Sequence, residues 1–139
     1  MCTYSEVYFN DVVENQGKLF DYFAFTYPEA DTEDFICSYM RSNTRKAIDS
    51  GMAYVSTMDY KTLLRYFCDT EHFKPKPGKS LDGFMPDWIG EFYAYYQWHY
   101  DIPSKTLIDK IPLRFLKAAY TGLHDLDLDL AVKKVGEGK

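Results

Sequence analysis

The sequence predicts an all-α fold, a single compact domain of about six to eight helices that spans residues 1–139. Three observations carry this prediction. Apolar residues recur at helical spacing along most of the chain, capping residues or glycine and proline stops separate these segments, and no repeat or linker-like tract divides them. A chain of this length buries roughly two thirds of its unfolded surface, so it can form a core without a metal or a disulfide.

The first predicted helix covers residues 5–26, whose apolar side chains share one broad face of a helical wheel. Ser5 or Thr3 is the expected N-cap. The helix is expected to stop before Pro28, since the residue that precedes a proline is pushed out of the α region.

Three further helices are expected before residue 70, each with polar capping residues at its start. The first begins at residues 31–34, the second at Ser42 or Asn43, and the third at residues 56–59 and runs through Phe67. The second of them ends at Ser50-Gly51, because glycine suits the left-handed position that closes a helix. Residues 52–55 are predicted to be a short extended link.

In the second half, the longest loop is expected over residues 69–82, where two prolines and a glycine prevent a continuous helix. A helix then runs from Pro86 to about His99. Two shorter helices follow, one capped by Ser104 and ending at Ile111, the other opened by Pro112, continuing to Ala119 or Tyr120 and closed by Gly122.

The last segment, residues 126–135, carries two conflicting patterns. Its leucines alternate with Asp127 and Asp129 as in a half-buried strand. Asp125 as a cap, two lysines near the end and Gly136 after them are instead typical of a helix, which is the structure we favour here.

Charge is unevenly distributed. The formal net charge is −5, and the first 34 residues contain eight acidic side chains and one lysine. An acidic chain does not attract phosphate backbones, so nucleic acid is not expected as a partner. Asp11, Glu14 and Asp21 lie on the polar face of the first helix and are candidates for binding a basic protein. No signal sequence or apolar span is evident, so we expect a cytoplasmic protein that does not bind membranes.

Motifs for catalysis, metals and nucleotides are incomplete. Gly78-Lys79-Ser80 resembles the end of a phosphate-binding loop, but the earlier glycine and the preceding strand are missing. The three histidines and three cysteines have no metal-ligand spacing, and Cys37 lies within an apolar helical run. We therefore predict no catalytic residues, no metal and no cofactor.

Aromatic residues concentrate between Trp88 and Tyr100. Most of them share one wide arc of the helix, which we interpret as a core face with His99 at its centre. Trp98 lies apart from this arc and near Glu91. Because tryptophan and tyrosine supply much of the binding energy in interfaces, Trp98, Tyr93 and Glu91 are candidates for a partner contact, and Gly90 and Ala94 would let another helix approach closely.

Two functions remain open at this point. The first is a non-enzymatic protein-interaction module, antitoxin-like or inhibitory, with a toxin or another basic protein as partner. Its candidate contacts are the residues already named together with Val7 and Phe25, two apolar residues that project on the polar face of the first helix. The alternative is a small-ligand binder or enzyme with a pocket lined by Tyr93, Tyr96, Trp98 and Tyr100, in which His99 or Glu91 would transfer a proton. The oligomeric state is not predicted.

The segment Tyr4-Ser5-Glu6-Val7-Tyr8-Phe9-Asn10-Asp11, followed by Gly17-Lys18-Leu19-Phe20-Asp21-Tyr22, resembles small uncharacterised bacterial proteins that begin S-E-V-Y-x-N-D and continue G-x-M-x-D-Y. The likeness covers about the first half of the chain. Such proteins are often encoded near small toxins with an ADP-ribosyltransferase-like fold. The resemblance therefore implies an accessory or antitoxin component.

Overall fold

The computed structural model describes residues 6–138, and within them it contains nine α-helices, one isolated β-bridge and no strand. This confirms the predicted all-α fold, with one helix more than the expected range. The helices are α1 Glu6–Thr26, α2 Thr32–Met40, α3 Asn43–Asp49, α4 Ala53–Ser56, α5 Tyr60–Glu71, α6 Met85–Tyr100, α7 Ser104–Lys110, α8 Leu113–Leu123 and α9 Leu128–Gly138. None of the helices in this range is both long enough and apolar enough to cross a membrane.

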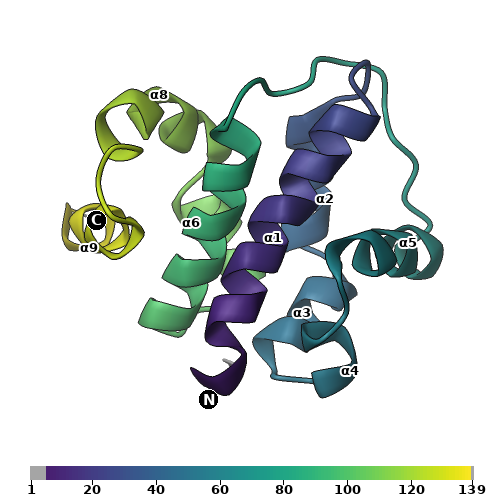
Figure 1. Ribbon diagram of the computed structural model, residues 1–139, viewed down its shortest axis with the longest axis horizontal. Helices are drawn as coiled ribbons and strands as arrows, with labels where there is room; N and C mark the ends of the chain where they lie inside the picture. Colours follow the sequence, from purple (N-terminus) through teal and green to yellow (C-terminus); the bar gives the residue numbers. More distant parts are fainter. Residues whose placement is uncertain (1–5, 139) are drawn as a thin grey trace.

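Helices α1 and α6 lie side by side at the centre of the molecule (Figure 1) and form its most extensive helix pair. Helices α2 to α5 lie on the α1 side, and α8 and α9 lie on the α6 side. Aromatic rings fill the space between α1, α2 and α5. Phe23 stacks on Phe35 with ring centroids 4.0 Å apart, and Phe67 meets Phe35 edge to face at 5.7 Å.

Two glycines allow α1 and α6 to approach closely. A Cβ atom on Gly90 would lie 2.6 Å from the carbonyl oxygen of Gln16 and 2.8 Å from the Cα of Gly17, so only glycine fits there. The Gln16 side chain donates a 2.7 Å hydrogen bond from Nε2 to the Gly90 carbonyl. The close approach predicted at Gly90 thus occurs, and the helix that approaches is α1 of the same chain.

Side-chain caps begin several helices where the sequence indicates them. The carboxylates of Asp31 and Asp59 and the hydroxyl of Ser42 each accept a hydrogen bond from the backbone N–H three residues later. These bonds satisfy N–H groups that have no partner inside the helix. The predicted caps Ser5 and Thr3 lie outside the described residues.

Other helix ends differ from the predictions. Residues 53–56 form a turn of helix where a link was expected, and α5 continues past Phe67. Gly122 lies inside α8 and Gly136 inside α9, so neither ends a helix. Gly136 is needed for a different reason, because a Cβ there would overlap the Tyr100 ring. The final segment is a helix, as favoured.

Ser104 is the first residue of α7 and does not cap it. Its backbone N–H and hydroxyl donate to Asp49 at 2.8 and 2.7 Å. Asp49 also pairs with the fully buried Arg45 at 3.2 Å. The Ser104–Asp49 hydrogen bonds join α3 to α7. The Arg45–Asp49 charge pair lies within α3 and tolerates burial because both partners are present.

Helix α6 is buried along a different arc from the one predicted. His99 is exposed, whereas Gln97 is fully buried. The reason is the position of α1, which covers the side of α6 that carries Gly90 and so buries residues outside the aromatic arc. The prediction of a core histidine is therefore wrong, while Phe92, Tyr93 and Tyr96 are core residues as expected.

Candidate functional site

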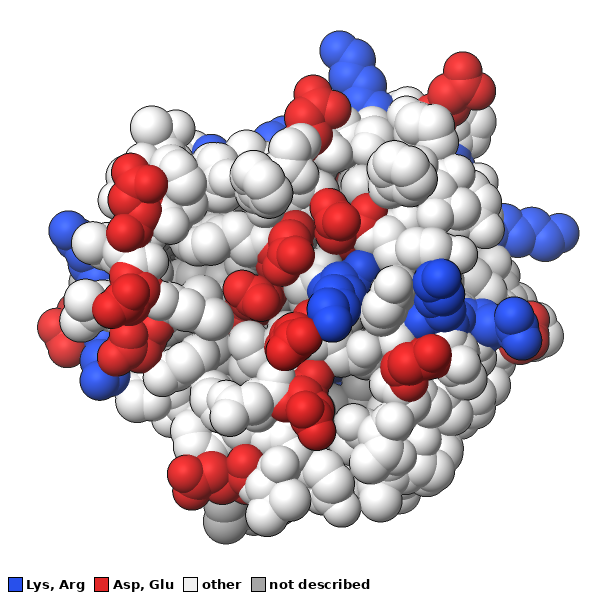
Figure 2. All heavy atoms as spheres, in the orientation of Figure 1, with Lys and Arg blue, Asp and Glu red and all other residues white. Residues whose placement is uncertain are grey.

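Carboxylates from α1 and α6 meet along the line where these two helices pack. Glu14 and Asp21 belong to α1, and Asp87 and Glu91 belong to α6. We call these four residues the acidic seam. Figure 2 shows acidic side chains gathered in the middle of this face, over α1 and α6, with a basic side chain among them.

The close packing at Gly17 brings the α6 carboxylates against α1. A Cβ on Gly17 would lie 2.7 Å from the Cγ of Glu91, and it would overlap the carboxylate of Asp87. The absence of a side chain at Gly17 therefore provides the space that Asp87 and Glu91 occupy. Both are half-buried, and a half-buried carboxylate loses part of its hydration.

This crowding changes the proton affinity of the seam. Burial, followed by repulsion from Asp87 and Glu14, raises the pKa of the Glu91 carboxyl to about 7. Burial and repulsion from Asp21 also raise the pKa of Asp87, although Lys18 partly opposes this effect. Near neutral pH, the Glu91 carboxyl is therefore partly protonated, because the seam disfavours a further negative charge.

Lys18 forms its ion pair with a carboxylate of α1. Its ammonium group pairs with Glu14 at 2.8 Å, one helical turn away. The hydrogen bond and the charge of Lys18 lower the pKa of the Glu14 carboxyl. Both side chains are largely exposed, so the pair adds little stability. Asp11, one turn before Glu14, is exposed on the same face of α1.

The remaining candidates on α1 and α6 differ in accessibility. The side chains of Val7 and Phe25 are 81% and 84% exposed. Trp98 is half-buried, with its ring 4.3 Å from that of Phe9. Tyr93 is fully buried and donates a 2.7 Å hydrogen bond to the Ile111 carbonyl, so a partner cannot reach it.

The aromatic residues of the alternative pocket differ in their surroundings. Tyr93 and Tyr96 belong to the core, and the grooves described below have other linings. Tyr100 packs against Gly136 of α9. The ring of His99 lies 4.6 Å from that of Tyr100.

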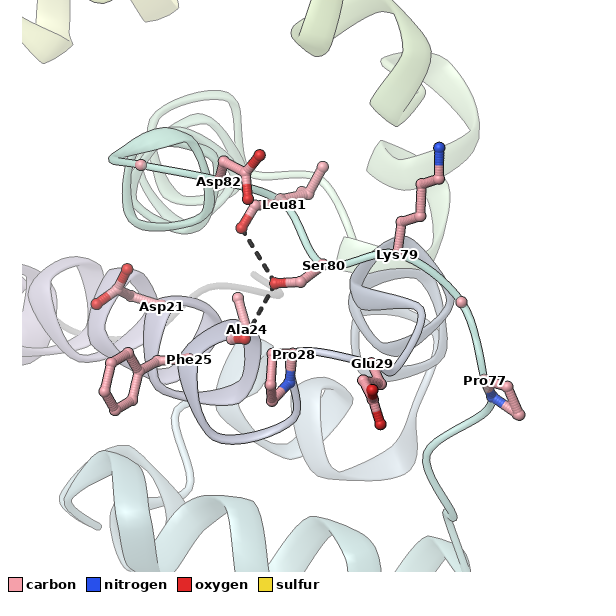
Figure 3. Close-up of a pocket in the computed structure, with 12 residues that line it drawn as sticks. Asp21, Ala24, Phe25, Pro28, Glu29, Pro77, Lys79, Ser80, Leu81 and Asp82 are labelled. Atoms are coloured by element: carbon pink, nitrogen blue, oxygen red, sulfur yellow. Dashed lines mark hydrogen bonds between the residues drawn. The ribbon is translucent and has the colours of Figure 1, made fainter.

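A groove of about 990 Å³ opens at the end of α1, between this helix and the loop that precedes α6. We call it the corner groove. Its lining residues, most of them labelled in Figure 3, are Asp21, Ala24, Phe25, Pro28, Glu29, Pro77, Gly78, Lys79, Ser80, Leu81, Asp82 and Gly83. Asp21 belongs to both surfaces and makes the corner groove continuous with the acidic seam.

The loop wall of the corner groove is fixed to the rest of the protein. The Gly78 N–H donates to the Glu29 carbonyl at 2.9 Å, and the Ser80 hydroxyl donates to the Ala24 carbonyl at 3.0 Å (Figure 3). A Cβ on Gly78 would lie 2.6 Å from the Cβ of Asp31, so the loop also packs closely against the start of α2. The residues that resemble the end of a phosphate-binding loop therefore have a structural role here.

A smaller groove of about 330 Å³ lies between the middle of α1 and the connection from α4 to α5. It is lined by Asp11, Glu14, Asn15 and Lys18 and by residues 56–60. The Asn15 amide donates a 3.0 Å hydrogen bond to the Met58 carbonyl, which holds the α4–α5 connection against α1. The exposed acidic face of α1 therefore borders a hollow along its middle and another at its end.

The described residues offer little reactive chemistry. Between Glu6 and Gly138, no three His, Cys, Asp or Glu side chains are grouped as metal ligands. Burial raises the pKa of the Cys37 and Cys68 thiols, which disfavours the reactive thiolate. Cys2 lies outside the described residues.

Asp87 and Asp82 were not among the sequence candidates. Asp87 follows Pro86 in the first turn of α6, a position where an acidic residue is explained by the helix dipole alone. Its role in the seam depends on Gly17, which lies 70 residues earlier in the chain. The feature of the sequence that relates to this contact is a glycine on each of the two helices, Gly17 on α1 and Gly90 on α6.

Compared with family models, with curated proteins and with solved structures, the chain has no match. The evidence for its function is therefore the geometry of the acidic seam and of the corner groove.

Proposed function

We propose that the protein is a non-enzymatic interaction module, antitoxin-like or inhibitory, that acts in the cytoplasm by binding a basic protein through its acidic seam. The observation that carries this proposal is the crowding of Asp87 and Glu91 with Glu14 at the crossing of α1 and α6. Burial and mutual repulsion raise the pKa of Glu91 to about 7, so the folded chain maintains an electrostatically unfavourable surface.

A cationic partner would relieve this repulsion. A lysine or arginine placed beside Asp87 and Glu91 supplies positive charge in addition to that of Lys18, which pairs with Glu14 and only partly offsets the repulsion at Asp87. The acidic surface would also speed the approach of a basic protein by electrostatic steering. The resemblance of the first half of the chain to toxin-associated proteins agrees with a basic toxin as partner.

The test is affinity capture from the host cell with three forms of the full chain. They are the wild type, the seam variant Asp87→Asn/Glu91→Gln, and the control Asp69→Asn/Glu137→Gln. Each variant replaces one aspartate and one glutamate by the neutral amide, and the control positions are exposed. Neutral residues in the seam remove repulsion, so the seam variant remains folded.

We expect the wild type and the control to capture one basic protein in stoichiometric amount, and the seam variant to lose it. Neutralisation of that protein's activity on co-expression would support an inhibitory role. The proposal is overturned when the wild type captures no stoichiometric protein, or when the seam variant captures it as well as the wild type does.

A further inference from the structure

The corner groove, like the acidic seam, carries a local excess of negative charge. Three carboxylates line it, from Asp21, Glu29 and Asp82, together with a single lysine, Lys79. The Lys79 side chain extends away from α1, as Figure 3 shows. The groove therefore favours a cationic occupant.

The end of helix α1 adds to this preference. Ala24 and Phe25, in the last turn of α1, line the groove, and this turn contains no basic residue. The C-terminal end of a helix carries partial negative charge on its unpaired carbonyl groups, which favours a cation nearby. A positive group in the groove would thus meet the helix end as well as the carboxylates.

Phe25 supplies an aromatic face beside these charges. Its side chain is 84% exposed, and it lies one helical turn after Asp21 on the same face of α1. Figure 3 shows Asp21 and Phe25 extending from α1, Asp82 on the loop across from them, and Pro77 at the other end of the groove. A planar guanidinium can stack on a ring while pairing with carboxylates, whereas an ammonium group cannot combine both contacts as well.

The walls of the groove are set before any partner binds. The loop is held by the Gly78–Glu29 and Ser80–Ala24 hydrogen bonds, and the Leu81 N–H donates to the Thr32 hydroxyl at 3.2 Å. A binding surface whose backbone is already ordered loses less conformational entropy on association. Charge complementarity and this order together favour a short, extended basic segment as the occupant.

We propose that the corner groove receives an arginine side chain of the basic partner, whose guanidinium stacks on Phe25 and pairs with Asp21, one helical turn earlier on the same face of α1. This inference rests on the proposed function, because it names how the partner of the acidic seam is recognised at the end of α1. It also distinguishes the two surfaces, since the seam selects positive charge and the groove selects arginine.

The test is an NMR titration of the full chain with acetyl-arginine-methylamide. Acetyl-citrulline-methylamide, its neutral counterpart, and acetyl-lysine-methylamide serve as comparison probes. We expect the arginine probe to shift the ring signals of Phe25 and the backbone signals of residues 79–83, the lysine probe to bind more weakly, and the citrulline probe to leave them unchanged.

Two pairs of variants separate the groove from the general surface. Phe25→Ala should weaken arginine binding by about two- to fivefold, the range of an exposed cation–π contact. Phe84→Ala is the matched control, because Phe84 is 83% exposed and does not line the groove. Asp21→Asn should weaken binding as well, and Asp69→Asn should not.

These measurements test the arginine site in the groove separately from partner binding at the seam. Equal shifts with arginine and citrulline, or arginine binding that Phe25→Ala and Asp21→Asn leave unchanged, overturn the groove proposal even when the seam still captures a basic protein. Arginine binding at the groove in a protein that captures no partner counts against the proposed function and leaves the arginine site established.

Discussion

Replacing Glu91 by glutamine should stabilise the protein at pH 8 and have no effect at pH 4. The pKa of Glu91 in the folded protein is about 7, against an ordinary value of 4.5, because burial and the charges of Asp87 and Glu14 disfavour the carboxylate. Between pH 4.5 and about pH 7, the folded state therefore binds more protons at Glu91 than the unfolded state does. Its stability therefore falls as the pH rises from about 4.5 to about 7 and changes little from this group above that range.

The size of the effect follows from the same difference. A shift from 4.5 to about 7 corresponds to roughly 3 kcal/mol if it is expressed in full. Glu91 is only half-buried, so solvent screening reduces the expected gain of the Glu91→Gln variant to about 1–2 kcal/mol at pH 8. At pH 4 the wild-type side chain is already neutral, and the two proteins should be equally stable.

The assay is urea unfolding of the wild type, Glu91→Gln and the control Glu137→Gln at pH 4 and pH 8. Glu137 is exposed on α9, so its replacement should leave the unfolding midpoint unchanged at both pH values. A Glu91→Gln protein that is no more stable than the wild type at pH 8, or whose gain is equal at pH 4, would refute the reasoning. A gain in stability together with a loss of partner capture would show that the seam is kept for binding at the expense of stability.

Further predictions concern the packing that positions the seam. Gly90→Ala should destabilise the protein by about 1–3 kcal/mol, because its Cβ would meet the α1 backbone; Gly122→Ala, whose Cβ meets nothing within 4 Å, should stabilise it by about 0.5–1 kcal/mol. Urea unfolding of both variants checks the pair, and similar effects would contradict the close crossing. Asp49→Ala should destabilise the protein by about 3–5 kcal/mol, because it leaves the fully buried Arg45 without its charge partner. A loss below 1 kcal/mol in thermal unfolding would contradict the assignment of this pair.

Much of the helical structure could be predicted because its signals are local. The caps at Asp31, Ser42 and Asp59 act on backbone groups three residues away, so the sequence near each helix start contains all the information. The long amphipathic pattern of α1 was predicted for the same reason. Its two exceptions, Val7 and Phe25, were visible on the wheel and are exposed.

The predictions were wrong where burial or the choice of a glycine depends on a helix that is distant in the sequence. Glycine usually marks a helix end, yet Gly136 lies within α9. A glycine is needed there because a Cβ would overlap the ring of Tyr100 on α6. The wheel placed His99 in the core, and this assignment failed because α1 covers another side of α6, the side on which Gln97 is buried. A single-helix pattern does not contain the position of the helix that packs on it.

The candidate site was predicted in its residue types more than in its arrangement. Glu14, Asp21 and Glu91 were identified from charge and position, but their meeting with Asp87 depends on the missing side chain at Gly17. The raised pKa of Glu91 follows from that contact and has no signal along the sequence. Tyr93 failed as a contact, since an aromatic residue suited to an interface is equally suited to the core.

Whether the acidic seam receives a basic protein is tested most directly by the association rate of the captured partner with the purified chain as the salt concentration is varied. For the wild type, the rate constant should fall steeply with salt, and for Asp87→Asn/Glu91→Gln it should be lower at low salt and depend less on salt. The control Asp69→Asn/Glu137→Gln should retain most of the wild-type dependence. A rate that does not change with salt, or one that changes equally in the wild type and the seam variant, would contradict binding through the seam.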